Sequence, residues 1–486
     1  MKLIPAILLI LSMVMATGCG QRKSGDDTTR KIENYLSELE KAGFNGSVLV
    51  ENDGKLILSE GYGFCNVERQ IKNSPATIFD IGSVTKQFTA AAILKLEMES
   101  RLSTNDKISV FFEDVPADKA DITIHDLLRH QSGLVSVIGG DYEKIDRKEF
   151  LEKVFSSPLR FEPGTRYSYS NIGYSLLALI IEKVSSEDYE TYLYENLWKP
   201  AHMETTGYTR PRFDTSMIAT GYDMDNNAWG KPTDKEWDKT SPYLHLKGNG
   251  GILSTVEDLY RWHRALMTEK ILSREAKQKL YHPELRSDES QSSYYAYGWD
   301  VSQTSRNTTR VWHNGTNRIF YADFMRFIDE GVVLIMLSNK SHPNFNGLNR
   351  ELATMIFNRD FVPEIPAEDN EVNRSLTRLI INTIEEHGIE KARQEYQERN
   401  SGAQLLEFMM RDAGFDCIDN GKPELAIKIF EMNVFAFPES AKALQGLAEG
   451  YMETGNKELA LQYFRESLNI NPDNPFISMM ISEIEE

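Results

Sequence analysis

A 34-residue repetition in the last third of the chain most constrains its fold. Five residues recur with this period: Gly421, Leu425, Ala426, Phe430 and Pro438 are followed by Gly455, Leu459, Ala460, Phe464 and Pro472. A fixed period of this length is typical of stacked helical hairpins, in which small residues lie at the helix crossing and proline follows the second helix. Each hairpin buries its apolar face only against a neighbour. The repetition therefore predicts an all-helical array.

The repeated unit resembles the tetratricopeptide repeat. One period before the first clear copy, Ala392 and Tyr396 indicate a degenerate third copy over residues 373–406. The resemblance implies an all-α tetratricopeptide-like domain over residues 373–486, after a Pro- and acid-rich linker at residues 361–372. Such an array commonly presents a concave face to a peptide or protein. Partner binding is favoured, and docking of the array on the rest of the chain is the alternative.

Ser83 and Lys86 are the first candidate pair for chemistry. They stand three residues apart before a nearly all-apolar run at residues 88–94. One helical turn brings Lys86 onto the face that carries Ser83, so that the lysine can take the hydroxyl proton. Gly82 opens a turn whose backbone N–H groups would face the group that Ser83 attacks. The alternative is a capping serine beside a solvated lysine.

Two further segments support the catalytic interpretation. Tyr169-Ser170-Asn171 lies in a Gly- and Pro-flanked loop before an apolar helix, where a phenol and an amide can be presented together. His313-Asn314-Gly315-Thr316 ends a β-prone run. Its glycine would let the edge of a sheet approach an acyl group closely.

In order and spacing, Ser83-x-x-Lys86, Tyr169-x-Asn171 and His313-x-Gly315 resemble the penicillin-recognising serine hydrolases. This family contains class C β-lactamases, D,D-peptidases, D-aminopeptidases and related esterases. The resemblance covers residues 30–360 and implies an α/β (α+β) domain of the β-lactamase/transpeptidase type. Its antiparallel sheet would combine the hairpin at residues 46–58 with strands within residues 309–338, beside a mostly helical lobe.

The resemblance implies a role for each of these residues. Ser83 would be the nucleophile that is acylated, while Lys86 and Tyr169 would share the proton relay, and which of the two is the main base stays open. The oxyanion hole would consist of the backbone N–H groups of Ser83 and Thr316. The residues that would bind the substrate are Asn171, His313, Gly315 and Thr316. The chemistry requires no metal and no cofactor.

His313 stands where many β-lactamases of this group carry lysine, and a histidine is neutral for much of the time at pH 7. Peptidase or esterase activity is therefore favoured over efficient penicillin hydrolysis, with D-amino-acid peptides, β-lactams or small esters as substrates. Arg318 is either a carboxylate clamp or an exposed strand-end arginine. His130 is expected to be structural. The alternative function is a non-catalytic penicillin-binding-fold sensor or scaffold that acts through its repeats.

The first eighteen residues combine a basic start with an apolar core and predict an export signal peptide. Small residues before Cys19 resemble a lipoprotein cleavage site, which would leave Cys19 lipidated and residues 19–29 as a tether. The expectation is a membrane-anchored lipoprotein of a bacterial cell envelope, and an ordinary cleaved signal is the alternative. The formal net charge of −19 argues against nucleic acid and against attraction to anionic lipid.

Overall fold

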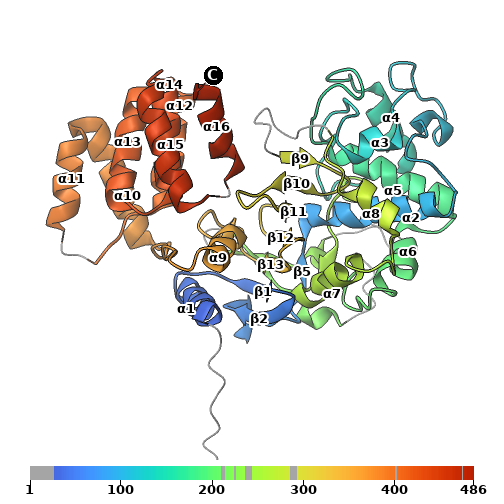
Figure 1. Cartoon of the computed structure of the whole chain (residues 1–486), viewed down its shortest axis with the longest axis horizontal. Coiled ribbons are helices and arrows are strands. Elements are labelled where there is room, and N and C mark those ends of the chain that lie inside the picture. Colours follow the sequence, from blue (N-terminus) through green and yellow to red (C-terminus); the bar gives the residue numbers. More distant parts are fainter. Residues whose placement is uncertain are drawn as a thin grey trace, which may run out of the picture.

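The structure is a computed structural model that describes residues 27–208, 214–223, 226–235, 243–284, 293–399, 402–472 and 474–485. Two parts are visible in Figure 1: a sheet domain (residues 27–357) and a helical array (residues 371–485). Cys19 and the predicted signal peptide lie outside the described residues. Among the described helices, none has the length and apolar character that crossing a membrane requires.

A seven-stranded antiparallel sheet forms the centre of the sheet domain. Its strands in chain order are β1 (Gly46–Asn52), β2 (Lys55–Tyr62), β9 (Ser293–Tyr295), β10 (Asp300–Gln303), β11 (Thr309–Thr316), β12 (Tyr321–Phe327) and β13 (Val332–Ser338). Their spatial order is β2-β1-β13-β12-β11-β10-β9. The predicted hairpin and the strands after residue 309 are present, and β9 and β10 extend the sheet beyond the prediction. Both added strands are short, so their local pattern is weak.

The central strands are buried on both faces. In β1, Val48 and Val50 belong to one apolar cluster and Leu49 to another on the opposite face. Alternate side chains of a strand point to opposite faces, so each strand contributes to both cores. Helices α1 (Asp27–Lys41) and α9 (Leu348–Phe357) cover the first face, and α2 (Lys86–Met98) and α7 (Val256–Leu266) lie on the second.

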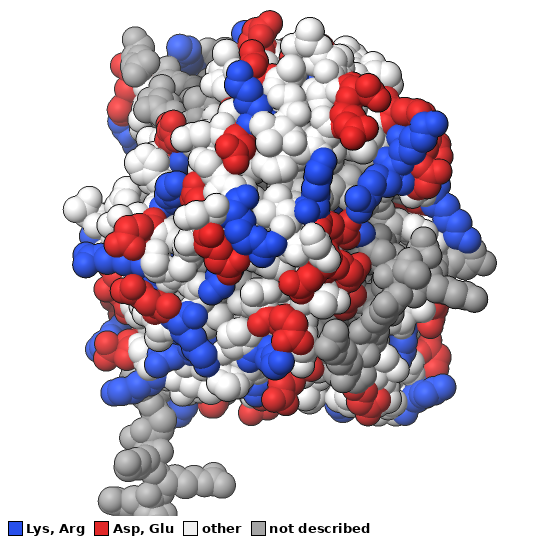
Figure 2. All heavy atoms as spheres, turned by 90° about the vertical axis from the view of Figure 1, so that its right-hand side faces the viewer, with Lys and Arg blue, Asp and Glu red and all other residues white. Residues whose placement is uncertain are grey.

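The helical lobe packs around α2, of whose thirteen residues ten are buried. The other helices of the sheet domain are α3 (Ile124–Leu128), α4 (Arg147–Ser156), α5 (Asn171–Ser185), α6 (Tyr189–Leu193) and α8 (Arg274–Leu280). Six short strands complete it: β3 (Phe64–Asn66), β4 (Ile71–Lys72), β5 (Phe79–Asp80), β6 (Gly221–Tyr222), β7 (Ala228–Gly230) and β8 (Leu253–Ser254). On the side turned to the right in Figure 1, acidic and basic side chains are interspersed (Figure 2).

The predicted array of helices is present. It consists of α10 (Glu371–His387), α11 (Ile389–Glu398), α12 (Glu407–Asp419), α13 (Pro423–Ala436), α14 (Ala441–Glu453), α15 (Lys457–Ile470) and α16 (Pro475–Glu485). The starts of α11, α13 and α15 are 34 residues apart, and so are those of α12, α14 and α16. Gly414 shows why small residues recur, because a Cβ there would stand 2.3 Å from the ring of Phe430.

Two predicted boundaries need correction. Helix α1 begins at Asp27 and buries Thr28, so the folded domain begins before residue 30 and residues 27–29 are not tether. The linker ends at Asn370, whose side chain caps α10 by accepting the N–H of Asn373 at 3.0 Å. Asp27 places a negative charge in the first turn of α1, where it interacts favourably with the helix dipole, and Asn370 is a favoured capping residue that binds a free N–H group of α10.

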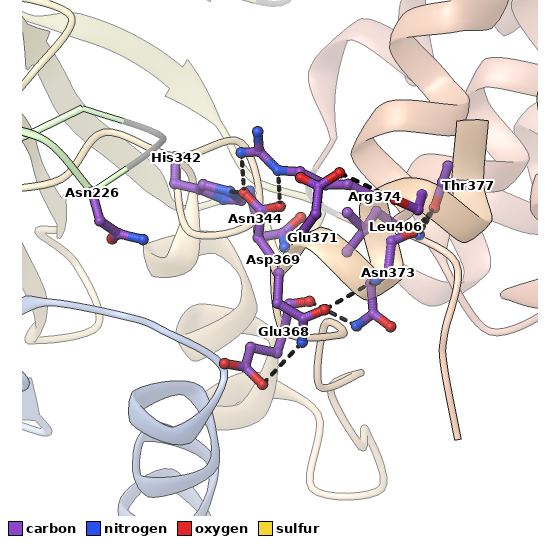
Figure 3. A network of polar contacts seen from close by, with 12 residues as sticks. Asn226, His342, Asn344, Glu368, Asp369, Glu371, Asn373, Arg374, Thr377 and Leu406 are labelled. Atoms are coloured by element: carbon purple, nitrogen blue, oxygen red, sulfur yellow. Dashed lines mark hydrogen bonds and ion pairs between the residues drawn. The ribbon is translucent and has the colours of Figure 1, made fainter. Parts of the chain in front are cut away.

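The array contacts the sheet domain through a buried polar network (Figure 3). His342, from the loop after β13, donates its Nε2–H to Asp369 of the linker at 2.9 Å. Arg374 of α10 binds the same carboxylate through Nε at 2.6 Å and Nη2 at 2.8 Å. The ring of Phe408 in α12 lies 5.0 Å from that of His342. The alternative left open by the sequence, docking of the array on the rest of the chain, is therefore observed.

Candidate active site

Ser83 lies in η1 (Gly82–Thr85), a short 3-10 turn between β5 and α2. Gly82 has φ +49°, and a Cβ there would stand 2.6 Å from the backbone nitrogen of Thr316. A Cβ on Gly315 would stand 2.2 Å from the carbonyl oxygen of Ile81. The two glycines therefore let the nucleophile turn and the end of β11 meet backbone against backbone, which brings the Ser83 and Thr316 segments together.

Lys86 is fully buried, and its Nζ contacts three oxygens. Nζ lies 3.0 Å from Ser83 Oγ, 2.9 Å from Asn171 Oδ1 and 2.8 Å from the carbonyl oxygen of Asn249. All three oxygens belong to neutral groups. Burial lowers the pKa of Lys86 well below its usual range, although the negative charge of Asp141 opposes the shift.

The geometry accommodates a neutral lysine, the form that burial favours. A neutral amine has two N–H donors and one lone pair, whereas an ammonium has three donors and no acceptor. Asn171 Oδ1 and the Asn249 carbonyl can only accept, so they take the two N–H groups. When the lysine is neutral, its lone pair is left for the one partner that carries a proton, the Ser83 hydroxyl; when it is protonated, Ser83 Oγ accepts its third N–H.

Tyr169 is the third predicted catalytic residue and lies beside the pair. The Nζ of Lys86 is 4.7 Å from the centroid of its ring. Burial raises the pKa of Tyr169, a hydrogen bond with Ser83 lowers it, and Asp300 raises it. The net direction is upward, so the phenol keeps its proton at neutral pH and can donate it.

His313 is neutral in this environment. Its Nδ1 lies 2.5 Å from the carbonyl oxygen of Asn314, and its Nε2 lies 2.9 Å from the hydroxyl of Tyr295. The carbonyl can only accept, so Nδ1 carries the proton and Nε2 accepts from Tyr295. Burial and the proximity of Lys86 lower the pKa of His313 to about 3. This side chain supplies no positive charge to the cleft.

His130 forms the loop hydrogen bond expected of a structural histidine, accepting the N–H of Ser170 on Nδ1 at 3.0 Å. Its ring also lies 4.2 Å from the ring of Tyr169 and 4.5 Å from that of Tyr295. Burial, followed by the proximity of Lys86, holds the pKa of His130 well below the usual range. His130 is therefore a neutral support beneath the Tyr169 phenol.

An open cleft of about 320 Å³ gives access to Ser83. The residues that line it are Ser83, Tyr167, Tyr169, Asp300, His313, Asn314, Gly315 and Thr316. Lys86 and Asn171 are not part of this lining: Lys86 contacts Ser83 from the protein interior, and Asn171 contacts Lys86. Arg318 is not part of the lining and its side chain is exposed, as expected for a strand-end arginine.

The sequence analysis missed three residues of the site. Asn249 binds Lys86 through its backbone, and the signal was the run of glycines at positions 248, 250 and 251. Tyr295 belongs to an aromatic cluster that is usually core packing. Asp300 follows this cluster directly and offers no pattern of its own. In the described parts of the chain, no three His, Cys, Asp or Glu side chains are arranged to hold a metal ion.

Comparison with known proteins agrees with this geometry. The family profile "Beta-lactamase" matches residues 32–356. The chain is 31% identical to the putative penicillin-binding protein PbpX of Bacillus subtilis over 57% of this chain and 67% of that protein. It is 29% identical to protein flp of Staphylococcus aureus, over 68% of this chain and 67% of that protein. The octameric penicillin-binding protein homologue from Pyrococcus abyssi superposes with a TM-score of 0.59 and 25% identity, covering 74% of this chain and 82% of that one.

Proposed function

Since this chain belongs to the beta-lactamase family, we propose that it is a serine hydrolase that cleaves its substrate through an acyl-enzyme on Ser83. One observation carries the proposal: Lys86 is fully buried, and its Nζ lies 3.0 Å from Ser83 Oγ while two further neutral oxygens hold it in place. A capping serine beside a solvated lysine would have neither the burial nor these three contacts. The pair is therefore arranged to make the hydroxyl a nucleophile.

Lys86 would be the main base in the acylation step. Its Nζ takes the proton of Ser83 Oγ as this oxygen forms a bond to the substrate carbonyl carbon. The pKa directions support this division of the relay, because burial favours the neutral amine of Lys86 and disfavours the phenolate of Tyr169. Tyr169 would donate its proton to the leaving group as the carbonyl–leaving-group bond breaks, and would recover a proton from Lys86.

The backbone N–H groups of Ser83 and Thr316 would stabilise the oxyanion of the tetrahedral intermediate. Their segments are in contact because glycine occupies both positions 82 and 315. Loss of one such donor typically lowers the rate by about 10²–10³-fold. Water would then hydrolyse the acyl-enzyme through the same groups in reverse order.

The charges of the cleft favour esters or peptides over penicillins. Asp300 carries the formal negative charge of the lining, and His313 adds no positive charge because it is neutral. A penicillin presents a carboxylate close to its reactive amide, and a carboxylate of the protein repels it. We propose as the substrate class small esters and D-amino-acid peptides that carry no free carboxylate beside the scissile bond.

The rest of the chain completes the proposal. Cys19 would be the lipid-anchored N-terminus of an exported cell-envelope protein, and the helical array would be formed by tetratricopeptide-like repeats. The 34-residue spacing of helix starts supports the repeat assignment. A protein or peptide partner would bind the part of the array that the sheet domain leaves uncovered.

Hydrolysis of p-nitrophenyl acetate by residues 20–486 tests the proposal. Wild type is compared with Ser83→Ala and with Ser375→Ala, a control serine on the exposed side of α10. We expect activity in wild type and in the control, and background in Ser83→Ala. Labelling by a fluorophosphonate probe should follow the same pattern. Equal background rates in all three proteins, without labelling, would favour the sensor or scaffold instead.

A further inference from the structure

We propose that Asp80 and Asn317 form a positioning pair that holds the two halves of the oxyanion hole in register, an inference that rests on the proposed function. Asp80 ends β5, three residues before Ser83. Asn317 follows Thr316 directly. The two residues are 237 positions apart in the sequence, and Asn317 Nδ2 donates a hydrogen bond to Asp80 Oδ2 at 3.0 Å.

Asp80 holds the nucleophile side of this link. Its side chain is buried, with an exposed fraction of 2% for the residue. Oδ1 accepts the backbone N–H of Gly82 at 2.8 Å, in the residue before Ser83. Each carboxylate oxygen therefore has one donor: the backbone of the nucleophile turn on one side, and the amide of Asn317 on the other.

Asn317 holds the strand side. Its Oδ1 accepts the backbone N–H groups of Ile319 at 3.0 Å and Phe320 at 2.7 Å. Because both of these partners are donors, the amide oxygen must face them and the amide NH₂ must face Asp80. The same two bonds shape the turn after Thr316, in which Arg318 adopts φ +73°.

The link matters because the two oxyanion donors come from separate segments. Gly82 and Gly315 bring these segments into contact but carry no side chain that could join them. The Asp80–Asn317 bond crosses between the segments, and it is charge-assisted when Asp80 is ionised. Donors of an oxyanion hole act only when they are placed correctly before the reaction, so a small displacement costs rate.

Exchanging the two side chains tests the pair. In Asp80→Asn, the NH₂ groups of positions 80 and 317 can face each other, so neither accepts. In Asn317→Asp, two carboxylates face each other, so neither donates. The double variant Asp80→Asn/Asn317→Asp restores one donor and one acceptor in reversed positions. The amide oxygen at position 80 can still accept from Gly82, and the second carboxylate oxygen at position 317 can still accept from Ile319 and Phe320.

We expect each single variant to lower kcat for p-nitrophenyl acetate by about tenfold to hundredfold, with KM changed less than about threefold. The double variant should recover kcat to within about tenfold of wild type. Thermal midpoints are measured for all four proteins. Asn317→Ser, which removes the amide without adding a charge, replaces any single variant that does not fold, and its kcat should fall similarly.

Single variants that fold and keep the wild-type kcat would overturn the pair. A folded double variant that is no more active than the single variants would overturn it too. Failure of the proposed function is a different result, because then the wild type itself would show no Ser83-dependent hydrolysis. That result would remove both proposals together.

Discussion

His313 in the cleft and His342 at the junction between the two domains are both buried, with exposed fractions of 3% and 1%. The partners of the two histidines differ. His342 donates to the carboxylate of Asp369, which Arg374 also binds through two nitrogens. His313 contacts a phenol and a backbone carbonyl, and its ionisable neighbour is Lys86.

The difference shows how one interior accommodates two kinds of polar network. At the junction a carboxylate balances the arginine, so the charges persist and hold the array against the sheet domain. In the cleft, Lys86 contacts three neutral oxygens. The pKa values of Lys86 and His313 both lie below their ordinary values. A buried lysine without a bound carboxylate is suited to accept a proton, whereas a half-buried arginine that binds a carboxylate is suited to link domains.

Replacing Lys86 with methionine should have the largest effect. Lys86→Met removes the lone pair that faces Ser83, and general bases typically contribute about 10²–10⁴-fold, so we expect kcat/KM for p-nitrophenyl acetate to fall by about 10³-fold. Lys148→Met, at an exposed lysine of α4, is the control and should change nothing. Retained activity in Lys86→Met would make Tyr169 the main base.

The next largest effect is expected at the junction. Asp369→Asn leaves Arg374 without its balancing charge, and breaking a buried pair in this way typically costs about 3 kcal/mol of unfolding free energy. The exposed Glu371→Gln, which removes the pairing of Glu371 with Arg378, should cost less than about 1 kcal/mol. Urea denaturation measures both. Equal midpoints would contradict a structural role for the Asp369 network.

A pH series separates the two histidines. The pKa of His313 in the folded state, about 3, lies below its ordinary value, so the unfolded state binds the extra proton and stability falls as pH drops below about 6.5. Between pH 7 and pH 5, wild type should lose about 2 kcal/mol more unfolding free energy than His313→Gln does. Groups common to both proteins cancel in this difference.

Between pH 7 and pH 5, the difference in lost unfolding free energy between wild type and His342→Gln should be smaller than the difference between wild type and His313→Gln. Burial also lowers the pKa of His342, but Asp369 raises it and so opposes the shift. Urea denaturation at pH 7 and pH 5 measures both differences. A larger pH dependence at His342 than at His313 would contradict the expectation that the Asp369 carboxylate reduces the pKa shift of His342.

Tyr295→Phe should produce the smallest effect. It removes the hydroxyl that donates to His313 Nε2, and a net hydrogen bond contributes about 1 kcal/mol. Tyr294→Phe, at the half-buried neighbour, is the control and should leave the unfolding free energy unchanged within about 0.5 kcal/mol. If both variants behave alike, the Tyr295 hydroxyl contributes nothing measurable to the network.

Much of the fold was predictable because its signals are local. The 34-residue spacing of small and apolar residues reappears as the spacing of helix starts, and the hairpin that the family resemblance implied at residues 46–58 is present as β1 and β2. Strands β9 and β10 have only three and four residues and escaped prediction. The start of α1 at Asp27 escaped because the polar residues before it indicated a tether.

The sequence predicted only part of the candidate site, because it indicated Ser83, Lys86 and His313 but missed Asn249, Tyr295 and Asp300. Ser83 and Lys86 lie within one turn of each other, so their spacing alone indicated the pair. The acceptors that orient the lysine come from Asn171 and Asn249, which are 85 and 163 positions away. The sequence by itself thus determined which chemical groups the protein carries and the helical period of its array. Only the tertiary structure decided which of these groups are charged, because a pKa depends on burial and on neighbours that distant segments supply.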